Sequence, residues 1–480
     1  MNFWDYINLS FPEIFIALAA MALLILGVLI GNKASREISL GAVGILVIAI
    51  FLTSFGGSPQ RVAIFDGAFS IDRFSVFAKV VIYLGAIIAI LMSDRFMVRE
   101  KIMRFEYPVL ILLAVLGMSI MVSATDLLAV YMGIELQSLS LYILAAFNRD
   151  SRRSTEAGMK YFVLGALSSG LLLYGASLIY GFTGATGFTA IAEGAANSSN
   201  IVGLIFGLVF FVSGLAFKVS AVPFHMWTPD VYEGAPTPIT AFFAAIPKFA
   251  GMLLFARVMV EAFPSVLDQW QGVIAIMAAA SMAVGAFAAI AQTNIKRLMA
   301  YSSIGHVGFA LMGIAAGTAD GVQSVLIYMT IYMVMTLGTF ALILSMRRTE
   351  GMTENIADLA GLIRTRPGLA IMFTVLFFSL AGIPPLLGFW GKFYVFFAAV
   401  EAGLLWLAIF GAVMSAVAAY YYLKVIYFIW FKDPSTEFEM NNGAAVSVTA
   451  WGSTLAMVFG IAMAIGPLRV AAEKAASVLF

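Results

Sequence analysis

The chain has 480 residues, of which 62% are hydrophobic and 11% charged, and it contains no cysteine. With 27 basic and 26 acidic residues its formal net charge is +1, so nothing in the charge balance suggests a nucleic-acid partner. Without thiolate ligands it cannot hold an iron–sulfur cluster, and a haem with two histidine ligands would need His225 and His306 to meet. We therefore expect no cofactor in this chain.

Long apolar stretches recur from one end of the sequence to the other. A helix of about 20 residues crosses the apolar core of a bilayer, whereas the shorter alternating segments of a membrane barrel are not seen. We predict an all-α polytopic membrane bundle that forms a single membrane domain over residues 1–480. Its fourteen predicted spans lie at roughly 11–30, 38–55, 73–92, 107–123, 126–147, 157–182, 201–232, 237–261, 271–292, 302–317, 322–346, 369–403, 404–430 and 447–467.

The basic residues of the connecting segments predict the orientation. Lysine and arginine gather in alternate connections, which the positive-inside rule places in the cytoplasm. The exceptions, in the other connections and ends, are Arg61, Arg73, Arg469 and Lys474. We expect both termini on the periplasmic side of a bacterial inner membrane. Because Asp5 lies before the first span, Glu13 lies at its start and the first basic residue is Lys33, we expect that span to be retained.

Two predicted spans are too long for one straight helix. The span 201–232 contains Pro223 near its middle, and the span 369–403 contains Pro384 and Pro385. Proline interrupts a helix and leaves carbonyl groups unpaired, which lipid cannot satisfy. Broken helices at corresponding places in two halves of a chain are typical of transporters built from inverted repeats, so we expect two inverted half-repeats.

Ionisable residues inside apolar spans are the strongest functional signal in the sequence. A charge at the bilayer centre costs at least about 2.5 to 3.5 kcal/mol and normally faces a bundle interior or a hydrated path. A buried lysine beside a carboxylate can store a proton, because burial disfavours its charged form and the carboxylate favours it. Five such residues form the candidate site, with two histidines as further candidates: Glu135, Lys160, Lys218, Lys248, Lys392, His225 and His306.

Several of these residues also have a structural explanation. Lys160 follows Glu156 by four residues, which is the spacing of a helical salt bridge, and it lies near the end of its span. His225 and His306 could equally be packing histidines. Three other basic residues lie close to span ends, and we expect them to extend to the membrane surface: Lys79, Arg257 and Lys424.

Three ordered blocks of sequence resemble one known family. They are KVSAVPFHMWTPDVYEGAPTPITAFF at 218–243, AYSSIGHVGFALMGI at 300–314 and AGIPPLLGFWGKF at 381–393. Together they resemble the antiporter-like membrane subunits of proton-pumping NADH:quinone oxidoreductase (respiratory complex I) and of multisubunit cation/proton antiporters. Within that family, the chain is most similar to the N branch. Three features carry this similarity: the motif TPDVYEGAPTPITAF, the chain length and the lysine at position 392.

The resemblance implies an organisation and a set of site residues. Residues 1–106 would form three N-terminal helices, 107–430 an antiporter-like core with two inverted half-repeats, and 431–480 a C-terminal helix. The key carboxylate of the family falls on Glu135 and its partner lysine on Lys160. The lysine of the first broken helix falls on Lys218, the central lysine on Lys248 and the exit-side lysine on Lys392.

The resemblance also implies a function: proton translocation as a subunit of the oxidoreductase, driven by electron transfer in partner subunits that carry flavin and iron–sulfur clusters. Expected partners are the other complex I membrane subunits and the lipid bilayer, with quinone reached only through the complex and no nucleic acid. The alternative is a subunit of a multisubunit sodium/proton antiporter, and a third option is a scaffold. One buried glutamate among four lysines suits a proton relay better than a cation site.

Overall fold

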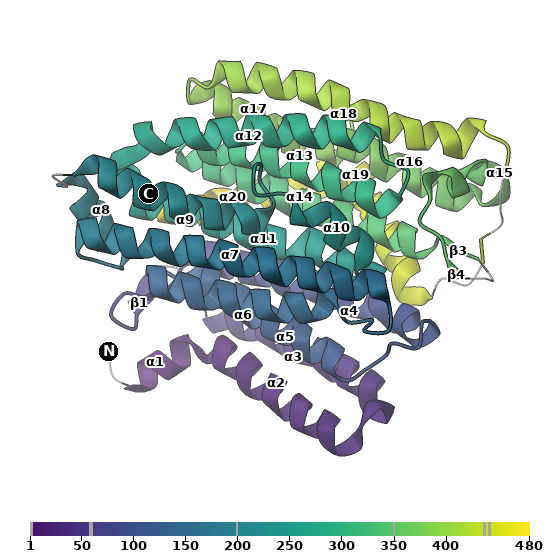
Figure 1. Ribbon diagram of the computed structural model, residues 1–480, viewed down its shortest axis with the longest axis horizontal. Helices are drawn as coiled ribbons and strands as arrows, with labels where there is room; N and C mark the ends of the chain where they lie inside the picture. Colours follow the sequence, from purple (N-terminus) through teal and green to yellow (C-terminus); the bar gives the residue numbers. More distant parts are fainter. Residues whose placement is uncertain (1–2, 57–60, 198–199, 349–350, 435–437, 440–442) are drawn as a thin grey trace.

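The computed structural model describes residues 3–56, 61–197, 200–348, 351–434, 438–439 and 443–480. Helices make up nearly all of this part of the chain and form one bundle (Figure 1). Within the described ranges, thirteen helices are long and apolar enough to cross a membrane. The remaining predicted span is the interrupted pair α16 and α17, so the prediction of a polytopic helical bundle is confirmed.

The N-terminal part contains four helices and a small β-hairpin. Strands β1 (Val62–Ile64) and β2 (Phe69–Ile71) pair antiparallel, with Ala63 opposite Ser70. Directly after the hairpin, Asp72 caps α4: its side chain accepts a hydrogen bond from the Ser75 N–H, and the Ser75 hydroxyl accepts one from the Asp72 N–H. The helices are α1 (Phe3–Leu9), α2 (Phe11–Ile30), α3 (Ser35–Gly56) and α4 (Arg73–Arg99).

The rest of the chain supplies two further groups of helices and a second short hairpin, β3 (Arg347–Arg348) with β4 (Gly351–Met352). The first group is α5 (Glu106–Ser123), α6 (Leu127–Ala145), α7 (Arg152–Thr183), α8 (Phe188–Ala196), α9 (Ile201–Val219), α10 (Trp227–Gly234) and α11 (Thr237–Ala262). The second is α12 (Leu267–Ile290), α13 (Ile295–Ala315), α14 (Ala319–Leu344), α15 (Leu362–Thr365), α16 (Pro367–Ala381), α17 (Leu387–Glu401), α18 (Leu405–Phe431), α19 (Ala444–Met463) and α20 (Ile465–Ala476).

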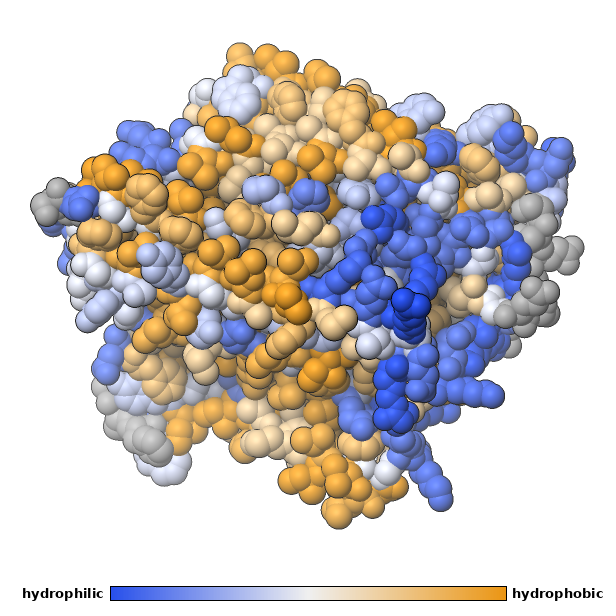
Figure 2. Space-filling model, in the orientation of Figure 1, coloured by the Kyte–Doolittle hydropathy of each residue, from blue (hydrophilic) through white to orange (hydrophobic). Residues whose placement is uncertain are grey.

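The bundle has two distinct ends. The helix α1, the β1–β2 hairpin and the C-terminus lie at one end, on the left in Figure 1, which we call the N-terminal face. The strands β3 and β4 and the helix α15 lie at the other end, on the right, which we call the basic face. Hydrophilic residues gather toward the basic face, and a broad hydrophobic surface covers the middle (Figure 2). A lipid bilayer fits this pattern, because its apolar core matches the hydrophobic surface.

The helices α11, α13 and α14 form the centre of the bundle. Each is almost wholly buried along its apolar length, whereas α2, α3 and α19 are mostly exposed there. A helix that is buried on all sides needs no polar stripe, so any ionisable side chain on it must find partners inside the protein. Lys248 lies on α11 and His306 on α13.

The first break, between α9 and α10, is present where the sequence predicted it. Ser220 ends α9 in the left-handed region with φ of 67°, and the Val222–Pro223 peptide bond is cis. The backbone groups freed by the break find side-chain partners. The Trp227 indole donates to the Phe217 carbonyl at 2.9 Å, and the Ser281 hydroxyl accepts from the Val222 N–H at 2.9 Å.

Two boundaries differ from the prediction. The helix α13 begins at Ile295 rather than near residue 302, because the Asn294 side chain caps it by accepting from the Lys296 and Arg297 N–H groups. At the C-terminus, α19 is followed by a separate helix, α20, which packs on α4 and α14. Its buried positions are alanines, Ala472 among them, so its short and weakly apolar sequence does not mark it as a span.

Candidate functional site

Glu135 and Lys218 form an ion pair inside the first group of helices. The Lys218 Nζ lies 3.8 Å from the Glu135 Oε1, and their side chains are 8% and 21% exposed. Ser169, on α7, links the two groups: its hydroxyl donates to the same Oε1 and accepts from Lys218 at 3.3 Å. Lys218 also donates to Ser138 at 2.8 Å and to the Tyr142 hydroxyl at 3.4 Å. The lysine therefore has hydrogen-bond partners on α6 and α7 besides the carboxylate.

The break after α9 determines where this lysine lies. Lys218 is the last residue but one of α9, so its amine is held where the helix ends within the bundle. The residues after it turn away through Ser220, and no further helical turn lies beyond the lysine. The ends of interrupted helices present unpaired backbone groups at membrane depth, and such places are used for ion binding.

Lys248 lies at the centre of the bundle, on α11. Its side chain is buried, its Nζ donates to the Ser303 hydroxyl at 2.5 Å, and the Nζ lies 5.2 Å from the centre of the Tyr232 ring. In the part of the chain that the structure describes, no carboxylate oxygen lies within 4 Å of this amine. The amine is therefore held by a hydroxyl group and an aromatic ring rather than by an ion pair.

His306 is held between two tyrosines. Its Nδ1 lies 2.6 Å from the Tyr328 hydroxyl, and its Nε2 lies 3.1 Å from the Tyr422 hydroxyl. Tyr422 in turn lies 2.5 Å from the Ser302 hydroxyl. Imidazole can donate at one nitrogen and accept at the other, so this arrangement can pass a proton through the ring. Tyr328 and Tyr422 were not among the predicted site residues, because a tyrosine within an apolar span is usually interpreted as a packing residue.

Lys392 lies just after the second break, at the start of α17. Its Nζ donates to the Ala381 carbonyl at 2.9 Å and to the Ser415 hydroxyl at 2.8 Å, and it lies 4.8 Å from the centre of the Phe309 ring. The Ala381 carbonyl ends α16, so the lysine itself satisfies a backbone group that the break leaves free. Gly382 follows with φ of 87°, and a Cβ there would lie 2.9 Å from the Lys392 Cδ. Only glycine suits this position.

Lys160 does not belong to this buried set. Its side chain is 43% exposed, and its Nζ pairs with Asp230 at 2.7 Å and with Glu156 at 2.9 Å. The structure places Lys218, rather than the Lys160 that the resemblance implies, next to Glu135. The helical spacing from Glu156 to Lys160 indicated the actual contact correctly.

Asp230 is the centre of a charged cluster on the basic face. It lies on α10, after the first break, and pairs with Lys160 and with Arg297, the latter at 2.8 Å. Partial burial acts to raise the pKa of Asp230, but the hydrogen bonds from these two cations outweigh it and leave the pKa below its usual value. Asp230 is therefore an ionised group that ties α7, α10 and α13 together.

His225 lies in the segment between α9 and α10. It is half-buried, and its Nδ1 has no hydrogen-bond partner among the described residues. Its carbonyl accepts from the Thr228 N–H at 3.0 Å, at the start of α10. The structure does not join His225 to Lys218 or Lys248, so its part in proton transfer stays a prediction.

Lys79 and Arg257 do not extend to the membrane surface, and that expectation is wrong. Both are buried. Lys79 pairs with Glu13 at 2.7 Å, and Arg257 pairs with Asp72 and, at 3.4 Å, with Glu261. Both residues lie near the ends of their predicted spans, but neighbouring helices and the β1–β2 hairpin cover those ends. By contrast, Lys424 is half-buried and donates to the Ile290 carbonyl at the end of α12.

The change Arg257→Lys should destabilise the protein by about 1 to 3 kcal/mol, the cost of leaving buried acceptors unpaired. The planar guanidinium of Arg257 pairs with Asp72 and Glu261, and its Nη1 donates to the Val122 carbonyl at 2.9 Å. A lysine ammonium cannot reach these three acceptors at once. Thermal unfolding of the purified protein measures the loss. The exposed Arg469 provides the matched control, Arg469→Lys, which should be neutral. Equal stability of Arg257→Lys and the parent would contradict the prediction.

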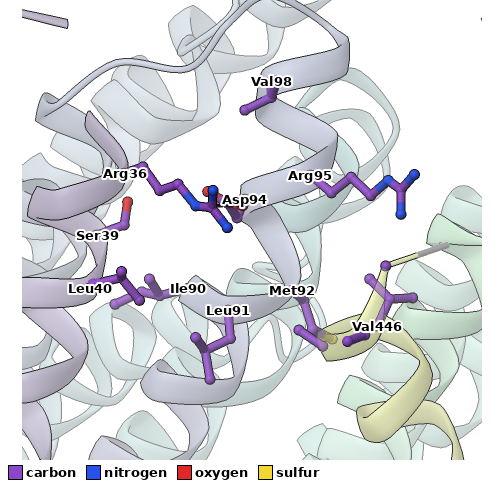
Figure 3. A pocket seen from close by; sticks show the side chains of 13 residues that line it. Arg36, Ser39, Leu40, Ile90, Leu91, Met92, Asp94, Arg95, Val98 and Val446 are labelled. Carbon is purple, nitrogen blue, oxygen red and sulfur yellow. Dashed lines mark ion pairs between the residues drawn. The ribbon is translucent and has the colours of Figure 1, made fainter. Parts of the chain in front are cut away.

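Among the described residues, the larger accessible cavities are lined by side chains other than Lys218, Lys248 and Lys392. One, of about 500 Å³, opens between α3, α4 and α19 and is lined by Arg36, Leu91, Asp94, Arg95 and Val446 among others (Figure 3). Among the described residues, no group of three or more histidine, aspartate or glutamate side chains is placed to hold a metal ion. The site around the two breaks brings together the buried amines, the Glu135 carboxylate, the His306 imidazole and several hydroxyl groups, all of which can exchange protons.

Comparison with known proteins gives consistent results. The family described as NADH:quinone oxidoreductase/Mrp antiporter, TM, matches residues 124–418. The chain is 54% identical over 476 residues to NADH-quinone oxidoreductase subunit N 1 of Rhizobium meliloti, covering 99% of this chain and 98% of that protein. It is 54% identical over 473 residues to NADH-quinone oxidoreductase subunit N of Parvibaculum lavamentivorans, covering 98% and 97%.

Solved structures agree with this. A chain in respiratory complex I from Thermus thermophilus with bound Aureothin superimposes with a TM-score of 0.80 at 32% identity, covering 94% of this chain and 97% of that chain. A chain of the Mrp complex from Dietzia sp. gives 0.84 at 20% identity, covering 98% of each, and at that identity the likeness is one of fold. The chain belongs to the NADH:quinone oxidoreductase/Mrp antiporter family of membrane subunits.

Proposed function

We propose that this chain is the N-type membrane subunit of a proton-pumping NADH:quinone oxidoreductase and moves protons through its buried Glu135, Lys218, Lys248 and Lys392. The observation that carries the proposal is the Glu135–Lys218 pair, buried where a helix is interrupted and linked by Ser169. The relatives of similar length are named as this subunit, which supports the same assignment.

The geometry suggests how a proton is held and released. With Glu135 at 3.8 Å, the carboxylate stabilises the charged form of Lys218. If the carboxylate moves away, the buried ammonium loses that stabilisation and its proton passes on toward Lys248. His306, between its two tyrosines, would then connect the α13 region with Lys392. Water molecules would bridge the remaining distances between these groups.

The basic-face cluster would lie at the entrance of this path. Lys160 and Asp230 are accessible, and they pack beside the first break, which carries Lys218. Lys160 would then collect or guide protons from the aqueous side rather than store them within the membrane. His225, in the same break, is the remaining candidate for a link from this surface inward.

The energy for pumping would come from partners. Moving one proton costs about 2.3 kcal/mol per 100 mV of membrane potential, and this chain contributes amines and hydroxyls but no thiolate for a cluster. We infer that electron transfer occurs in partner subunits that carry flavin and iron–sulfur clusters, with quinone reached only through the complex. The chain would lie in a bacterial inner membrane beside other complex I membrane subunits, with its N-terminal face on the periplasmic side.

We also propose that residues 107–430 consist of two inverted half-repeats, flanked by helices from 1–106 and 431–480. Each half would contribute one interrupted helix. Both interruptions have a residue in the left-handed region, Ser220 in one and Gly382 in the other. A lysine lies within four positions of Ser220 in the first half, and Lys392 contacts the residues around Gly382 in the second.

A subunit of a multisubunit sodium/proton antiporter is the second candidate, favoured by the fold likeness to the Mrp complex chain. A cation site needs several oxygen ligands, usually with more than one carboxylate. The buried set described here has one carboxylate and three amines, which would repel a sodium ion. This observation favours the oxidoreductase.

Purification of the chain with its native partners separates the two candidates. An affinity tag on the chain should bring down an assembly that contains flavin and iron–sulfur clusters and that oxidises NADH with a quinone acceptor. Recovery of an assembly made only of membrane subunits, with sodium/proton exchange and no NADH oxidation, would contradict the proposed function.

A further inference from the structure

A second buried Glu–Lys pair lies outside the row of lysines, among α2, α4 and α5. The Lys79 Nζ lies 2.7 Å from the Glu13 Oε1, and the two side chains are 3% and 8% exposed. Ser119 donates to the same Oε1 at 2.7 Å, and the hydroxyl groups of Tyr83 and Ser119 lie 2.8 Å apart. Because the serine proton is directed to the carboxylate, the tyrosine must donate to the serine. Two hydroxyl groups therefore lead to one carboxylate.

The composition of this cluster matches that of the Glu135 site. In each, a glutamate accepts from a serine and pairs with a buried lysine, and a tyrosine hydroxyl completes the set. The clusters use different helices, α2, α4 and α5 in one and α6, α7 and α9 in the other. In Figure 1, α2 lies at the lower edge of the bundle, whereas α17, the helix that carries Lys392, lies near the top.

The two oxygens of Glu13 have different surroundings. Oε1 accepts from Ser119 and faces Lys79, whereas Oε2 is buried without a hydrogen-bond partner among the described residues. A buried carboxylate oxygen without a donor costs stability, and a buried ion pair adds little to it. If the Glu13–Lys79 pair had only a structural role, apolar residues at these two positions would stabilise the protein at least as well. An Oε2 that binds a proton in one state of the protein explains why the carboxylate is present.

The position of the cluster is close to the N-terminal face. Glu13 is the third residue of α2, and Ser119 is the fifth from the end of α5, so both lie within about two helical turns of that face. Lys79 lies on α4 two turns beyond Asp72, and its Nζ is 4.9 Å from the centre of the Phe69 ring in the β1–β2 hairpin. The hairpin thus covers the cluster on the side where a proton would leave.

We propose that Glu13, with Lys79, Ser119 and Tyr83, forms a second proton-holding site beneath the N-terminal face. On loading, one proton binds the Glu13 Oε2 and the carboxylate becomes a neutral acid. On release, the same proton leaves Oε2 and the ion pair with Lys79 is restored. The inference rests on the proposed proton translocation, since the site would hold protons that this chain moves.

The test uses the double variant Glu13→Gln with Lys79→Met in the assembled complex. Removing both charges together leaves no unpaired ion in the interior. The complex should therefore assemble even if the Glu13–Lys79 pair has only a structural role in the parent. Proton-transfer groups contribute about 10²-fold or more to a rate, so we expect pumping per electron in inverted vesicles to fall at least about tenfold. The exposed Glu193 on α8 provides the control, Glu193→Gln, which should pump normally. Normal pumping by the double variant would overturn the proposal.

Two further measurements keep the result interpretable. Glu135→Gln is assayed in the same vesicles: if it loses pumping while the double variant does not, only the Glu13 site is refuted, and if Glu135→Gln pumps normally the proposed function itself fails. If the double variant does not assemble, Glu13→Asp and the parent complex are compared by infrared difference spectroscopy between acid and alkaline pH. A shift of the carboxylic acid C=O band in Glu13→Asp supports the site, and identical spectra overturn it.

Discussion

The change Lys218→Arg should abolish proton pumping in an enzyme that still assembles. Arginine keeps the positive charge and can still pair with Glu135, but its guanidinium effectively never gives up its proton inside a protein. If Lys218 must release a proton in every cycle, the loss should approach that of Lys218→Ala, at least about tenfold given the usual contribution of a proton-transfer group. Pumping and quinone reduction are measured together in inverted membrane vesicles.

The control for this change is Lys432→Arg, at the exposed end of α18, which applies the same chemical alteration where no proton path is expected. Arg257 is unsuitable as a control because it is buried among acidic partners. Assembly is checked on native gels, since the guanidinium is larger than the ammonium that Ser138 and Ser169 now contact. An assembled Lys218→Arg enzyme that pumps normally would show that this residue only supplies charge.

The change Glu135→Gln should also leave the complex assembled and lower coupled activity at least about tenfold. The amide keeps the shape of the side chain and can still contact Ser169, but it removes the negative charge 3.8 Å from the Lys218 amine. Without that charge, the buried ammonium is no longer stabilised in the state that holds the proton. Coupled activity is measured as proton uptake driven by NADH oxidation in vesicles.

Glu156 provides the matched control for this change. It is an exposed carboxylate on α7 that pairs with Lys160, so Glu156→Gln removes an ion pair of low energetic value and should have little effect. Full pumping by an assembled Glu135→Gln enzyme would contradict the proposed function, because the Glu135–Lys218 pair is the observation that carries it.

Much of the fold could be predicted because membrane spans are specified by length and composition alone. Both interrupted helices were predictable as well, since proline has a direct effect on helical hydrogen bonding. The start of α13 was not, because a capping residue such as Asn294 acts through one side chain. The helix α20 was not predicted, since it is short and its buried residues are alanines, so its sequence lacks the long apolar stretch that marks a span.

The site shows a similar division. The burial of Lys218, Lys248 and Lys392 follows from their position in apolar segments, and the structure confirms it. The partner of Glu135 does not follow, because pairing depends on which helices are neighbours, and that is decided by packing across the whole bundle. In the same way, Lys79 and Arg257 lie near span ends in the sequence. The sequence does not show that the β1–β2 hairpin and adjacent helices cover these ends, so their burial could not be predicted.

If buried lysines carry protons through the middle of this chain, removal of the Lys248 amine should stop pumping. Lys248 has no carboxylate within 4 Å among the described residues, so Lys248→Met removes the amine without orphaning a carboxylate partner. The measurement is the number of protons taken up per NADH oxidised in inverted vesicles, with Lys432→Met as the control for the same substitution at the surface. We expect the assembled Lys248→Met complex to lose pumping while the control retains it. An unchanged number of protons per NADH in Lys248→Met would show that the buried amine is not needed for pumping.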